Sequence, residues 1–199
     1  MKTPLFLRNI KFLGLMVLGI IMGRAASKKL THQTYEYALR EGVSLELDLF
    51  LPESGASHSN KPCPLIIWFH GGGWQMGSRE SIELAAVKQV ARGYAVASVS
   101  YSLTDVALWP AQAHEAKAAV RWLRANAGKF NINPEQFVAW GMSAGGHIAA
   151  ILGTSADVEE LNGELGNEKI SNAVQAVIAF YPPTDFLQMV NDGLLDHFA

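Results

Sequence analysis

Short apolar runs alternate with helical stretches over most of this chain, and this alternation restricts the possible folds more than any other feature. Four runs contain almost no polar residues, which is typical of strands buried on both faces of a sheet. They lie at residues 65–69, 94–99, 137–140 and 174–180. Parallel strands are usually buried in this way, because the connecting helices cover both faces. The sequence therefore predicts an α/β protein with a mostly parallel, doubly wound sheet.

Three stretches near these runs have the features of helices. Residues 81–92 and residues 110–127 are each followed by a glycine, which commonly comes just after the last residue of a helix. The second stretch also carries apolar residues three and four positions apart, which gives a helix one apolar stripe. Residues 144–152 form the third expected helix. We expect these elements to form a single domain over residues 30–199.

Two segments before the first buried run have the pattern of a hairpin. Residues 34–39 and 43–51 are separated by Glu41-Gly42, which is a turn signal. Leucine occupies every second position from 45 to 51, and this alternation is typical of a strand with one buried face. The sequence therefore predicts an antiparallel hairpin with one face in water, placed before the parallel strands.

The first 25 residues differ in charge from the rest of the chain. They contain four basic residues and no acidic one, and residues 12–22 form an uncharged apolar run followed by small residues. This pattern predicts a signal peptide at residues 1–25, with a cleavage site at Gly23-Arg24-Ala25, and hence a secreted or periplasmic protein. The apolar run is shorter than the roughly 20 residues of a membrane-spanning helix, so an uncleaved membrane anchor is the second interpretation.

The charge of the remaining chain excludes one class of partner. Beyond the leader, 12 of the 16 basic residues and all 18 acidic residues remain, a net charge of −6. A domain with this charge and no basic stripe is a poor partner for nucleic acid or for an anionic membrane surface. We therefore expect no nucleic-acid partner, and membrane contact only through the leader. The sequence does not indicate an oligomeric state.

A glycine-rich turn stands directly between an expected strand and an expected helix. Residues 141–145 read Gly-Met-Ser-Ala-Gly, a G-x-S-x-G pattern. In this context the pattern predicts a nucleophile elbow, in which a sharp turn presents the Ser143 hydroxyl at the end of the strand. The flanking glycines are needed because side chains there would clash with the neighbouring strand and helix. The alternative is a serine that only caps the helix.

A second glycine-rich turn follows the apolar run 65–69. Residues 70–74 read His-Gly-Gly-Gly-Trp. Acyl transfer builds negative charge on the carbonyl oxygen, and converging backbone N–H groups can stabilise that charge. The alternatives are a flexible loop or a phosphate-binding loop, although the G-x-x-x-x-G-K-[ST] pattern of the latter is absent. The two turns together predict acyl-transfer chemistry better than either does alone.

The two motifs, HGGGW and GMSAGGH, resemble those of the α/β-hydrolase fold. The nearer resemblance is to its esterase branch that includes hormone-sensitive-lipase-like proteins and feruloyl and acetyl-carbohydrate esterase-like proteins. The resemblance covers roughly residues 34–190. Further stretches of the sequence that match this branch are Gly77-Ser78, Trp109-Pro110-Ala111-Gln112, residues 118–124, residues 131–135 and residues 181–185.

This resemblance implies a reaction and the residues that carry it out. It implies hydrolysis of carboxylic esters, of the short-acyl or sugar and feruloyl type, through an acyl-enzyme on Ser143. The N–H groups of Gly72, Gly73 and Ala144 would form the oxyanion hole, and His70 would stabilise its loop. No cofactor is expected. No metal site is expected either, because the sequence has no H-E-x-x-H motif and no Cys/His cluster.

A serine hydrolase needs an acid and a base that form a catalytic triad with the serine, and these two residues are harder to place in the sequence. In this fold they follow the serine in the order Asp or Glu, then His, after strands later than those identified above. Only 56 residues follow Ser143, so we expect a C-terminally truncated chain that lacks its last strands and is inactive alone. Asp185 and His197 are the candidates within the chain. His147 is expected to be a structural hydrogen-bonding residue, and Glu115, like Asp105, to be solvated.

Two other functions remain open at this level. A catalytically silent binding domain would keep the turn at Ser143 but lack a base and an acid. A peptidase or amidase could use the same scaffold. Four aromatic residues lie just past strand ends or in the loops that follow them, where they either line a ligand pocket or simply pack. These residues are Trp74, Tyr101, Trp109 and Tyr181.

Overall fold

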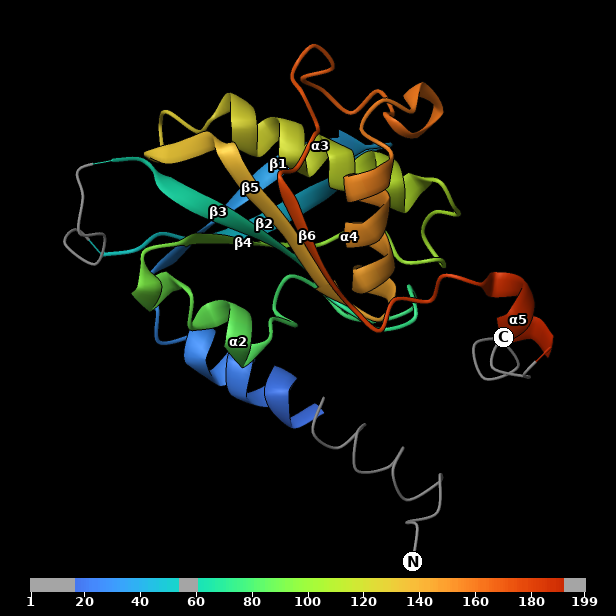
Figure 1. Cartoon of the computed structure of the whole chain (residues 1–199), viewed down its shortest axis with the longest axis horizontal. Helices are drawn as coiled ribbons and strands as arrows, with labels where there is room; N and C mark the ends of the chain where they lie inside the picture. The colour runs from blue at the N-terminus through green and yellow to red at the C-terminus, as the bar shows by residue number, and fades with distance from the viewer. Residues whose placement is uncertain (1–16, 54–60, 192–199) are drawn as a thin grey trace, which may run out of the picture.

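The expected strands lie side by side in one sheet. A computed structural model describes residues 17–53 and 61–191 of the chain. Within these residues six strands form a mixed sheet in the order β1-β2-β4-β3-β5-β6 (Figure 1). The strands are β1 (His32–Arg40), β2 (Val43–Phe50), β3 (Cys63–Phe69), β4 (Ala95–Val99), β5 (Ile132–Met142) and β6 (Ala176–Phe180).

The pairing confirms the predicted arrangement of the sheet. Strand β3 pairs in parallel with both β4 and β5, and β5 pairs in parallel with β6. Strands β1 and β2 form an antiparallel hairpin that joins the sheet along β4. The turn between them uses left-handed backbone at Glu41 and Gly42 (φ 50° and 85°). The sheet is therefore mostly parallel, with an antiparallel hairpin at its N-terminal edge.

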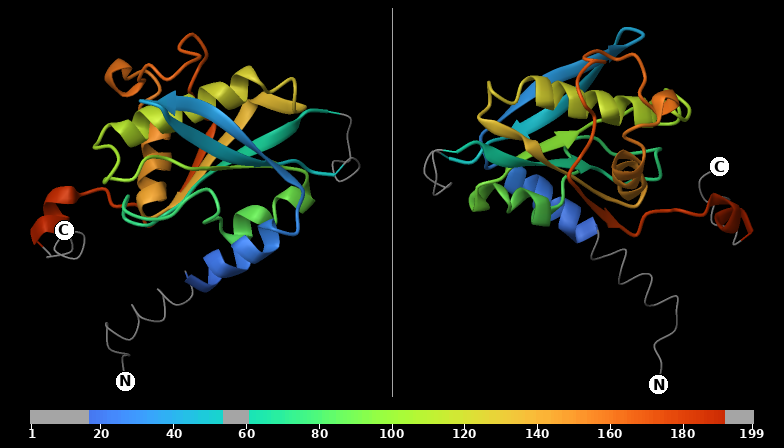
Figure 2. Two further views of the ribbon diagram at one scale, coloured as in Figure 1. Left: turned by 180° about the vertical axis from the view of Figure 1, so that it is seen from behind. Right: turned by 45° about the horizontal axis from the view of Figure 1, so that its top comes forward.

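Helical segments cover both faces of the sheet (Figures 1 and 2). On one face lie the two longest described helices, α3 (Ala111–Ala125) and α4 (Ala144–Thr154). On the other face lie α2 (Leu84–Val87), the 3₁₀ turn Val90–Arg92 and a helix at residues 17–27. The remaining helical segments are the 3₁₀ turn Glu159–Leu161 and α5 (Phe186–Asn191).

The apolar side chains of β3 supply both halves of the core. Leu65, Ile67 and Phe69 belong to the cluster on the side of α3 and α4, whereas Ile66 and Trp68 belong to the cluster on the side of α2. All five are buried. Successive side chains of a strand point to opposite faces, so a continuous apolar run is what a strand covered on both sides requires.

The face of β2 that carries Asp48 and Phe50 is less exposed to solvent than its sequence predicts. Asp48 and Phe50 lie on the face opposite the leucines, yet they are only 6% and 2% exposed. Phe50 packs with Ile82 and Val87. Asp48 accepts a hydrogen bond from Arg79 Nε at 2.9 Å. The prediction that one face of the hairpin lies in water is therefore wrong for β2, because the segment around α2 covers that face.

The helix expected over residues 81–92 is shorter and interrupted. It ends as predicted at Gly93, whose φ of 87° is left-handed. Its first residues are not helical, because side chains of the sheet bind the chain at and just before its start. Trp68 Nε1 donates to the carbonyl of Ser81 at 3.0 Å, and Ser98 Oγ donates to that of Arg79, two residues before the stretch, at 2.6 Å. The tertiary contacts thus override the local helical preference.

Glu115, which was expected to be solvated, is fully buried on α3. Its carboxylate accepts hydrogen bonds from Ser102 N at 2.6 Å and from Ser102 Oγ at 2.7 Å. It also pairs with Arg40 Nε at 2.6 Å. The prediction was wrong because Glu115 lies on a side of the helix that β1 and the loop after β4 cover. Asp105, by contrast, is exposed as expected.

Replacing Glu115 with alanine should destabilise the fold by about 3 kcal/mol. The change leaves Arg40 and the Ser102 N–H without their buried partner, and breaking one side of a buried pair is costly. Urea unfolding followed by circular dichroism measures the difference. Asp105→Ala removes an exposed carboxylate and should change stability by less than about 0.5 kcal/mol. A loss below about 1 kcal/mol for Glu115→Ala would show that the pair is not a structural anchor.

Three basic side chains of α3 anchor the long connection between α4 and β6. Lys117 Nζ donates to Val158 O at 3.3 Å and to Asn162 Oδ1 at 2.9 Å. Arg121 Nη1 donates to the carbonyl of Asn162 at 2.8 Å. Arg124 binds the connection closer to β6, where its Nη2 donates to the carbonyl of Ala173 at 2.6 Å. These bonds hold the connection against α3, so that the chain returns to the sheet as β6.

Strand β6 forms one edge of the sheet. Val177 and Phe180 on this strand are 37% and 46% exposed. Within the described residues no strand pairs with the free edge of β6. The expectation that further strands follow remains a prediction.

Part of the predicted leader is described and lies against the domain. Residues 17–27 are helical, and a Cβ added to Gly23 would lie 2.0 Å from the carbonyl oxygen of Ile82. Arg24 also forms an ion pair with Glu80. In the parts of the chain that are described, no helix combines the length and apolarity needed to cross a membrane. Residues 1–16 lie outside the described residues, and export through a cleaved leader stays a prediction.

Candidate active site

Ser143 occupies the sharp turn between β5 and α4. Its backbone has φ 53° and ψ −123°, a conformation that a residue with a side chain rarely adopts. Such strain costs on the order of 1–3 kcal/mol and is commonly found at functional sites. The turn is held by hydrogen bonds on both sides: Ser143 N donates to Phe180 O at 2.9 Å, and His147 N donates to Ser143 O at 3.0 Å.

The glycines on either side of Ser143 are required by close backbone contacts. A Cβ on Gly141 would lie 2.1 Å from the carbonyl oxygen of Gly145. A Cβ on Gly145 would lie 2.0 Å from the carbonyl oxygen of Phe69, at the end of β3. The start of α4 can therefore pack directly on the end of β3 only because these positions are glycine. This is the steric reason for the glycines that the sequence suggested.

The side chain of Ser143 does not act as a helix cap. Ser143 stands at the N-cap position of α4, but its hydroxyl makes no capping hydrogen bond. The side chain is half-buried. The hydroxyl is therefore not used to stabilise the helix, contrary to the alternative that the sequence left open.

The structure brings the 70–74 turn next to Ser143. Strands β3 and β5 are parallel neighbours, and Phe69 is paired with Gly141, so the loops after both strands start at the same edge of the sheet. A Cβ added to Gly71 would lie 3.4 Å from Ser143 Cβ. The two glycine-rich turns, about seventy residues apart in the sequence, thus lie so close together that a side chain at position 71 would touch Ser143.

The backbone of the 70–74 turn adopts conformations that favour glycine. Gly72 and Gly73 have φ angles of 125° and 62°. Their N–H groups, and that of Ala144 at the first position of α4, donate no hydrogen bond to another described residue. The N–H at the first position of a helix has no partner within the helix. Three backbone donors near Ser143 are therefore free to bind a ligand oxygen.

His70 is buried beneath this turn. Its Nδ1 lies 2.8 Å from the carbonyl oxygen of Gly71, and its ring stacks on Tyr101 with centroids 4.2 Å apart. The Tyr101 hydroxyl donates to the carbonyl of His70 at 2.7 Å. Burial lowers the pKa of His70 from 6.5 to about 4, so the ring is neutral at neutral pH. These contacts suit a residue that supports the loop.

This lowered pKa predicts an acid-dependent loss of stability. The unfolded chain binds a proton near pH 6.5 and the folded chain only near pH 4, so His70 destabilises the fold progressively as the pH falls through that range. The total effect is about 3 kcal/mol. Urea unfolding at pH 7 and pH 4 measures it. In His70→Phe, which keeps a ring against Tyr101, the difference in unfolding free energy between pH 7 and pH 4 should be smaller by about this amount. An unchanged difference would show that other groups cause it.

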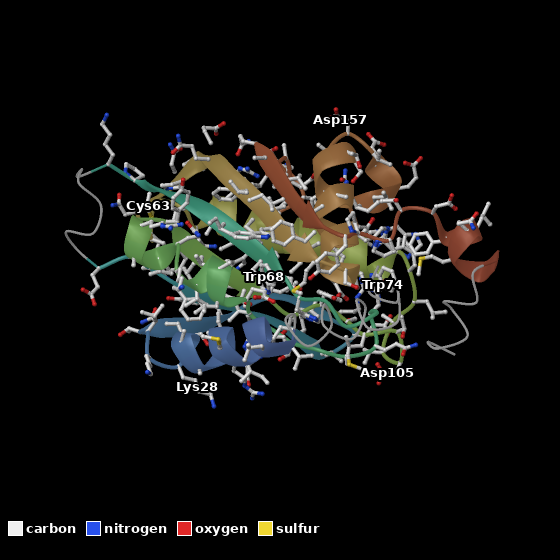
Figure 3. The ribbon with its side chains drawn as sticks, turned by 60° about the horizontal axis from the view of Figure 1, so that its bottom comes forward. Lys28, Cys63, Trp68, Trp74, Asp105 and Asp157 are labelled. Atoms are coloured by element: carbon white, nitrogen blue, oxygen red, sulfur yellow. The ribbon has the colours of Figure 1, made fainter. Side chains whose placement is uncertain are left out.

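A cavity of about 440 Å³ lies beside the two turns. It is lined by Trp74, Thr104, Trp109, Gln112, His147 and Phe186. Trp74 directly follows the glycines of the 70–74 turn, and His147 lies one helical turn after Ser143. Figure 3 shows Trp74 at the end of the molecule where α4 and α5 lie, far from Cys63 at the start of β3. The cavity is therefore adjacent to the Ser143 turn.

His147 lies among the aromatic walls of this cavity rather than in a hydrogen-bond network. Its ring centroid is 5.5 Å from those of Trp74 and Trp109 and 5.3 Å from that of Phe186. Within residues 17–53 and 61–191, its side chain has no hydrogen-bond partner. The prediction that His147 is a structural hydrogen-bonding residue is therefore wrong, because α4 directs this side chain toward the loops and not into the core.

The four aromatic residues at strand ends divide into different environments. Trp74 and Trp109 line the cavity, as one interpretation of the sequence proposed. Tyr101 is buried against His70, and Tyr181 is 44% exposed. Phe186 also lines the cavity but was not predicted to do so. Its position directly after the turn at Asp185, past a strand end, could have indicated it. Isolated apolar residues after polar turns are common, however, so this position alone does not single it out.

Asp185 caps the last described helix. Its Oδ1 accepts a hydrogen bond from Gln188 N at 2.9 Å, at the start of α5, and the residue is exposed. The carboxylate contacts no histidine in the described part of the chain. His197, the candidate base, lies outside the described residues. Nor do three or more His, Cys, Asp or Glu side chains gather within those residues in a way that could hold a metal ion.

The comparison with protein families gives a direct match to this arrangement. The BD-FAE family model matches residues 47–197, which include both glycine-rich turns. The chain belongs to the BD-FAE family.

Individual relatives of this BD-FAE protein are esterases. It is 33% identical over 127 residues to Esterase LipC of Mycobacterium tuberculosis, an alignment that covers 63% of the chain and 31% of LipC. The structure of Thermogutta terrifontis esterase 2 phosphorylated by paraoxon superimposes with a TM-score of 0.67 and 27% identity, covering 76% of the chain and 57% of that enzyme. A truncated carbohydrate esterase from gut microbiota gives a TM-score of 0.68 and 29% identity, covering 80% and 60%.

These matches confirm the expected α/β-hydrolase fold. The BD-FAE chain spans about a third of the length of LipC and somewhat over half of the two structural relatives. The shared fold and sequence therefore concern one part of those proteins.

Proposed function

We propose that this BD-FAE protein hydrolyses carboxylic esters through an acyl-enzyme on Ser143. The observation that carries the proposal is the approach of the two turns: a Cβ added to Gly71 would lie only 3.4 Å from Cβ of Ser143, whose backbone is strained. A nucleophile and donors for its oxyanion must converge on one carbonyl group, and this close approach supports such a convergence. The esterase relatives support the same reaction.

In the first step the Ser143 oxygen attacks the ester carbonyl carbon while a histidine takes the hydroxyl proton. The carbonyl oxygen becomes an oxyanion, which the N–H groups of Gly72, Gly73 and Ala144 stabilise. Collapse of this intermediate breaks the ester C–O bond, and the histidine returns the proton to the leaving alcohol. Water then attacks the acyl-enzyme by the same route and releases the acid.

The histidines near Ser143 do not fit the role of the base. His70 uses Nδ1 on the Gly71 carbonyl and is buried against Tyr101. His147 has no carboxylate partner to orient it. We propose that the base and its acid lie after Ser143 in the order Asp then His, with Asp185 and His197 as candidates within this chain. Because the BD-FAE chain spans only part of its relatives, the base could also be encoded after residue 199.

The cavity supports a proposal about the substrate. Its walls are largely aromatic, with Trp74, Trp109 and Phe186 around a volume of about 440 Å³, enough for a small organic group. We propose a short-acyl or sugar or feruloyl-type ester, with an aromatic or apolar part in this cavity. The carbohydrate esterase among the relatives is consistent with this substrate class.

Labelling by an organophosphate tests the proposed nucleophile. The relative from Thermogutta terrifontis is phosphorylated by paraoxon, so we expect paraoxon to add one diethylphosphoryl group to this protein, at Ser143. Intact-mass and peptide mass spectrometry on the product of the complete reading frame detect the adduct. The Ser143→Ala variant should remain unlabelled.

The result also separates the alternatives. A catalytically silent binding domain would remain unlabelled in wild-type form, and its reading frame would supply no further Asp and His after residue 199. A peptidase or amidase would be labelled but would cleave p-nitroanilides faster than the matching p-nitrophenyl esters. Labelling of wild type with preference for esters supports the esterase proposal.

A further inference from the structure

His147 is a polar group among the aromatic residues of the cavity wall, and none of the steps above uses it. Its Nδ1 is sealed from solvent and has no partner among residues 17–53 and 61–191. Its Nε2 likewise has no partner in that part of the chain but is not sealed. Since His147 lines the cavity, Nε2 is the ring atom that can reach a ligand there.

The surroundings of His147 determine which nitrogen carries the proton. Burial lowers the pKa of this imidazole, so it is neutral at neutral pH and has one N–H. A buried N–H without an acceptor is rarer in proteins than a buried acceptor without a donor. Nδ1 has no acceptor to bind, so the proton belongs on Nε2. The cavity therefore receives an N–H donor.

The other polar residues of the cavity narrow the possible contacts. Gln112 uses its side-chain N–H groups on the carbonyls of Ser102 and Ala107, at 3.0 and 2.7 Å, and so has no donor left for a ligand. Thr104 contributes a hydroxyl, which is exposed. Besides His147, the donors in the lining are the Thr104 hydroxyl and the indole N–H groups of Trp74 and Trp109.

We propose that His147 is a specificity-determining residue whose Nε2–H binds an oxygen acceptor on the aromatic ring of an ester held between Trp74, Trp109 and Phe186. The inference rests on the proposed ester hydrolysis at Ser143 and identifies the part of the substrate that the cavity selects. The aromatic walls hold the ring, and the His147 N–H distinguishes a ring with an acceptor from one without.

Binding of two matched esters tests this proposal without requiring turnover. Methyl 4-acetylbenzoate and methyl 4-isopropylbenzoate have similar sizes and the same ester group, but only the first has a second carbonyl acceptor on the ring, para to the ester. Isothermal titration calorimetry is done on the full chain with Ser143→Ala, so that neither ester is consumed. We expect the acetyl compound to bind about fivefold more tightly, the effect of one neutral hydrogen bond.

Variants at His147 distinguish the effect of its N–H donor on binding from the effect of its aromatic ring. His147→Phe keeps an aromatic side chain, so the isopropyl ester should bind within about twofold of its original affinity while the preference for the acetyl ester is lost. His147→Gln restores a side-chain N–H and should recover a preference of about threefold. Thr104→Val should leave the preference unchanged. The ¹⁵N shifts of the ring, measured by two-dimensional NMR, should show the proton on Nε2.

Several outcomes would overturn the proposal. One is a preference that survives His147→Phe and disappears in Thr104→Val, since this would assign the donor to Thr104. The proposal would also be contradicted if the two esters bind equally well to the Ser143→Ala protein with His147 intact, if neither ester binds, or if the proton of His147 is on Nδ1. If paraoxon labels Ser143 but the preference is absent, only this inference fails. If the preference is present without labelling, the proposed catalytic function fails.

Discussion

Replacing Ser143 with alanine is expected to lower kcat for ester hydrolysis by about 10⁴-fold or more. We propose that this hydroxyl is the nucleophile, because Ser143 has a strained backbone and lies next to the 70–74 turn, where the Gly72 and Gly73 N–H groups bind no other described residue. The measurement is steady-state hydrolysis of p-nitrophenyl acetate by the product of the complete reading frame. Ser44→Ala, at an exposed serine of β2, should retain full activity.

Stability measurements on the same position give an independent check. Ser143→Gly removes the side chain from a backbone with φ 53°, which glycine tolerates without cost. The variant should be inactive but more stable than wild type by about 1 kcal/mol, in urea unfolding. An active Ser143→Ala enzyme, or a Ser143→Gly variant that is less stable, would show that the turn is not a strained nucleophile position.

Replacing Gly72 with alanine is expected to lower kcat by about 10²- to 10³-fold. The Cβ would lie 2.1 Å from the carbonyl oxygen of Met76, at a φ of 125°, so the turn must move and its N–H groups with it. The loss corresponds to roughly 3–4 kcal/mol of transition-state stabilisation, the value of an oxyanion-hole donor. KM should change much less than kcat, because the donors act mainly on the charge that develops in the transition state.

Gly42→Ala is the matched control for this variant. Gly42 also has a left-handed φ, 85°, but a Cβ there meets nothing within 4 Å, and Gly42 does not line the cavity beside Ser143. It should destabilise the chain through its backbone strain without changing kcat. If Gly72→Ala changes kcat by less than about threefold, the 70–74 turn does not supply the oxyanion hole.

Much of the fold could be predicted because the decisive signals are local. An apolar run such as residues 65–69 has to be covered on both faces, whatever the rest of the chain does. The glycine at position 141 likewise follows from a local requirement, since a Cβ there would lie 2.1 Å from the carbonyl oxygen of Gly145 in the same turn. For these elements the local preference and the tertiary structure agree.

The wrong predictions concern residues whose environment comes from distant segments. Glu115 has the residue type of a solvated position, but Arg40 and Ser102 surround it in the folded chain. The first residues of the 81–92 stretch favour a helix, but Trp68 binds the carbonyl of Ser81 and Ser98 binds that of Arg79 just before the stretch. Nothing in the local sequence distinguishes these positions, because their partners lie on other strands.

For this protein, the sequence alone determined the alternation of strands and helices, the turn at Ser143 and the loop of three glycines at 71–73. These features depend on backbone sterics and on apolar patterning, which act over a few residues. Only the tertiary structure decided that β3 and β5 are neighbours and that His147 faces an aromatic cavity. The order of strands in a sheet depends on which surfaces pack together, and packing joins residues that are far apart in the chain.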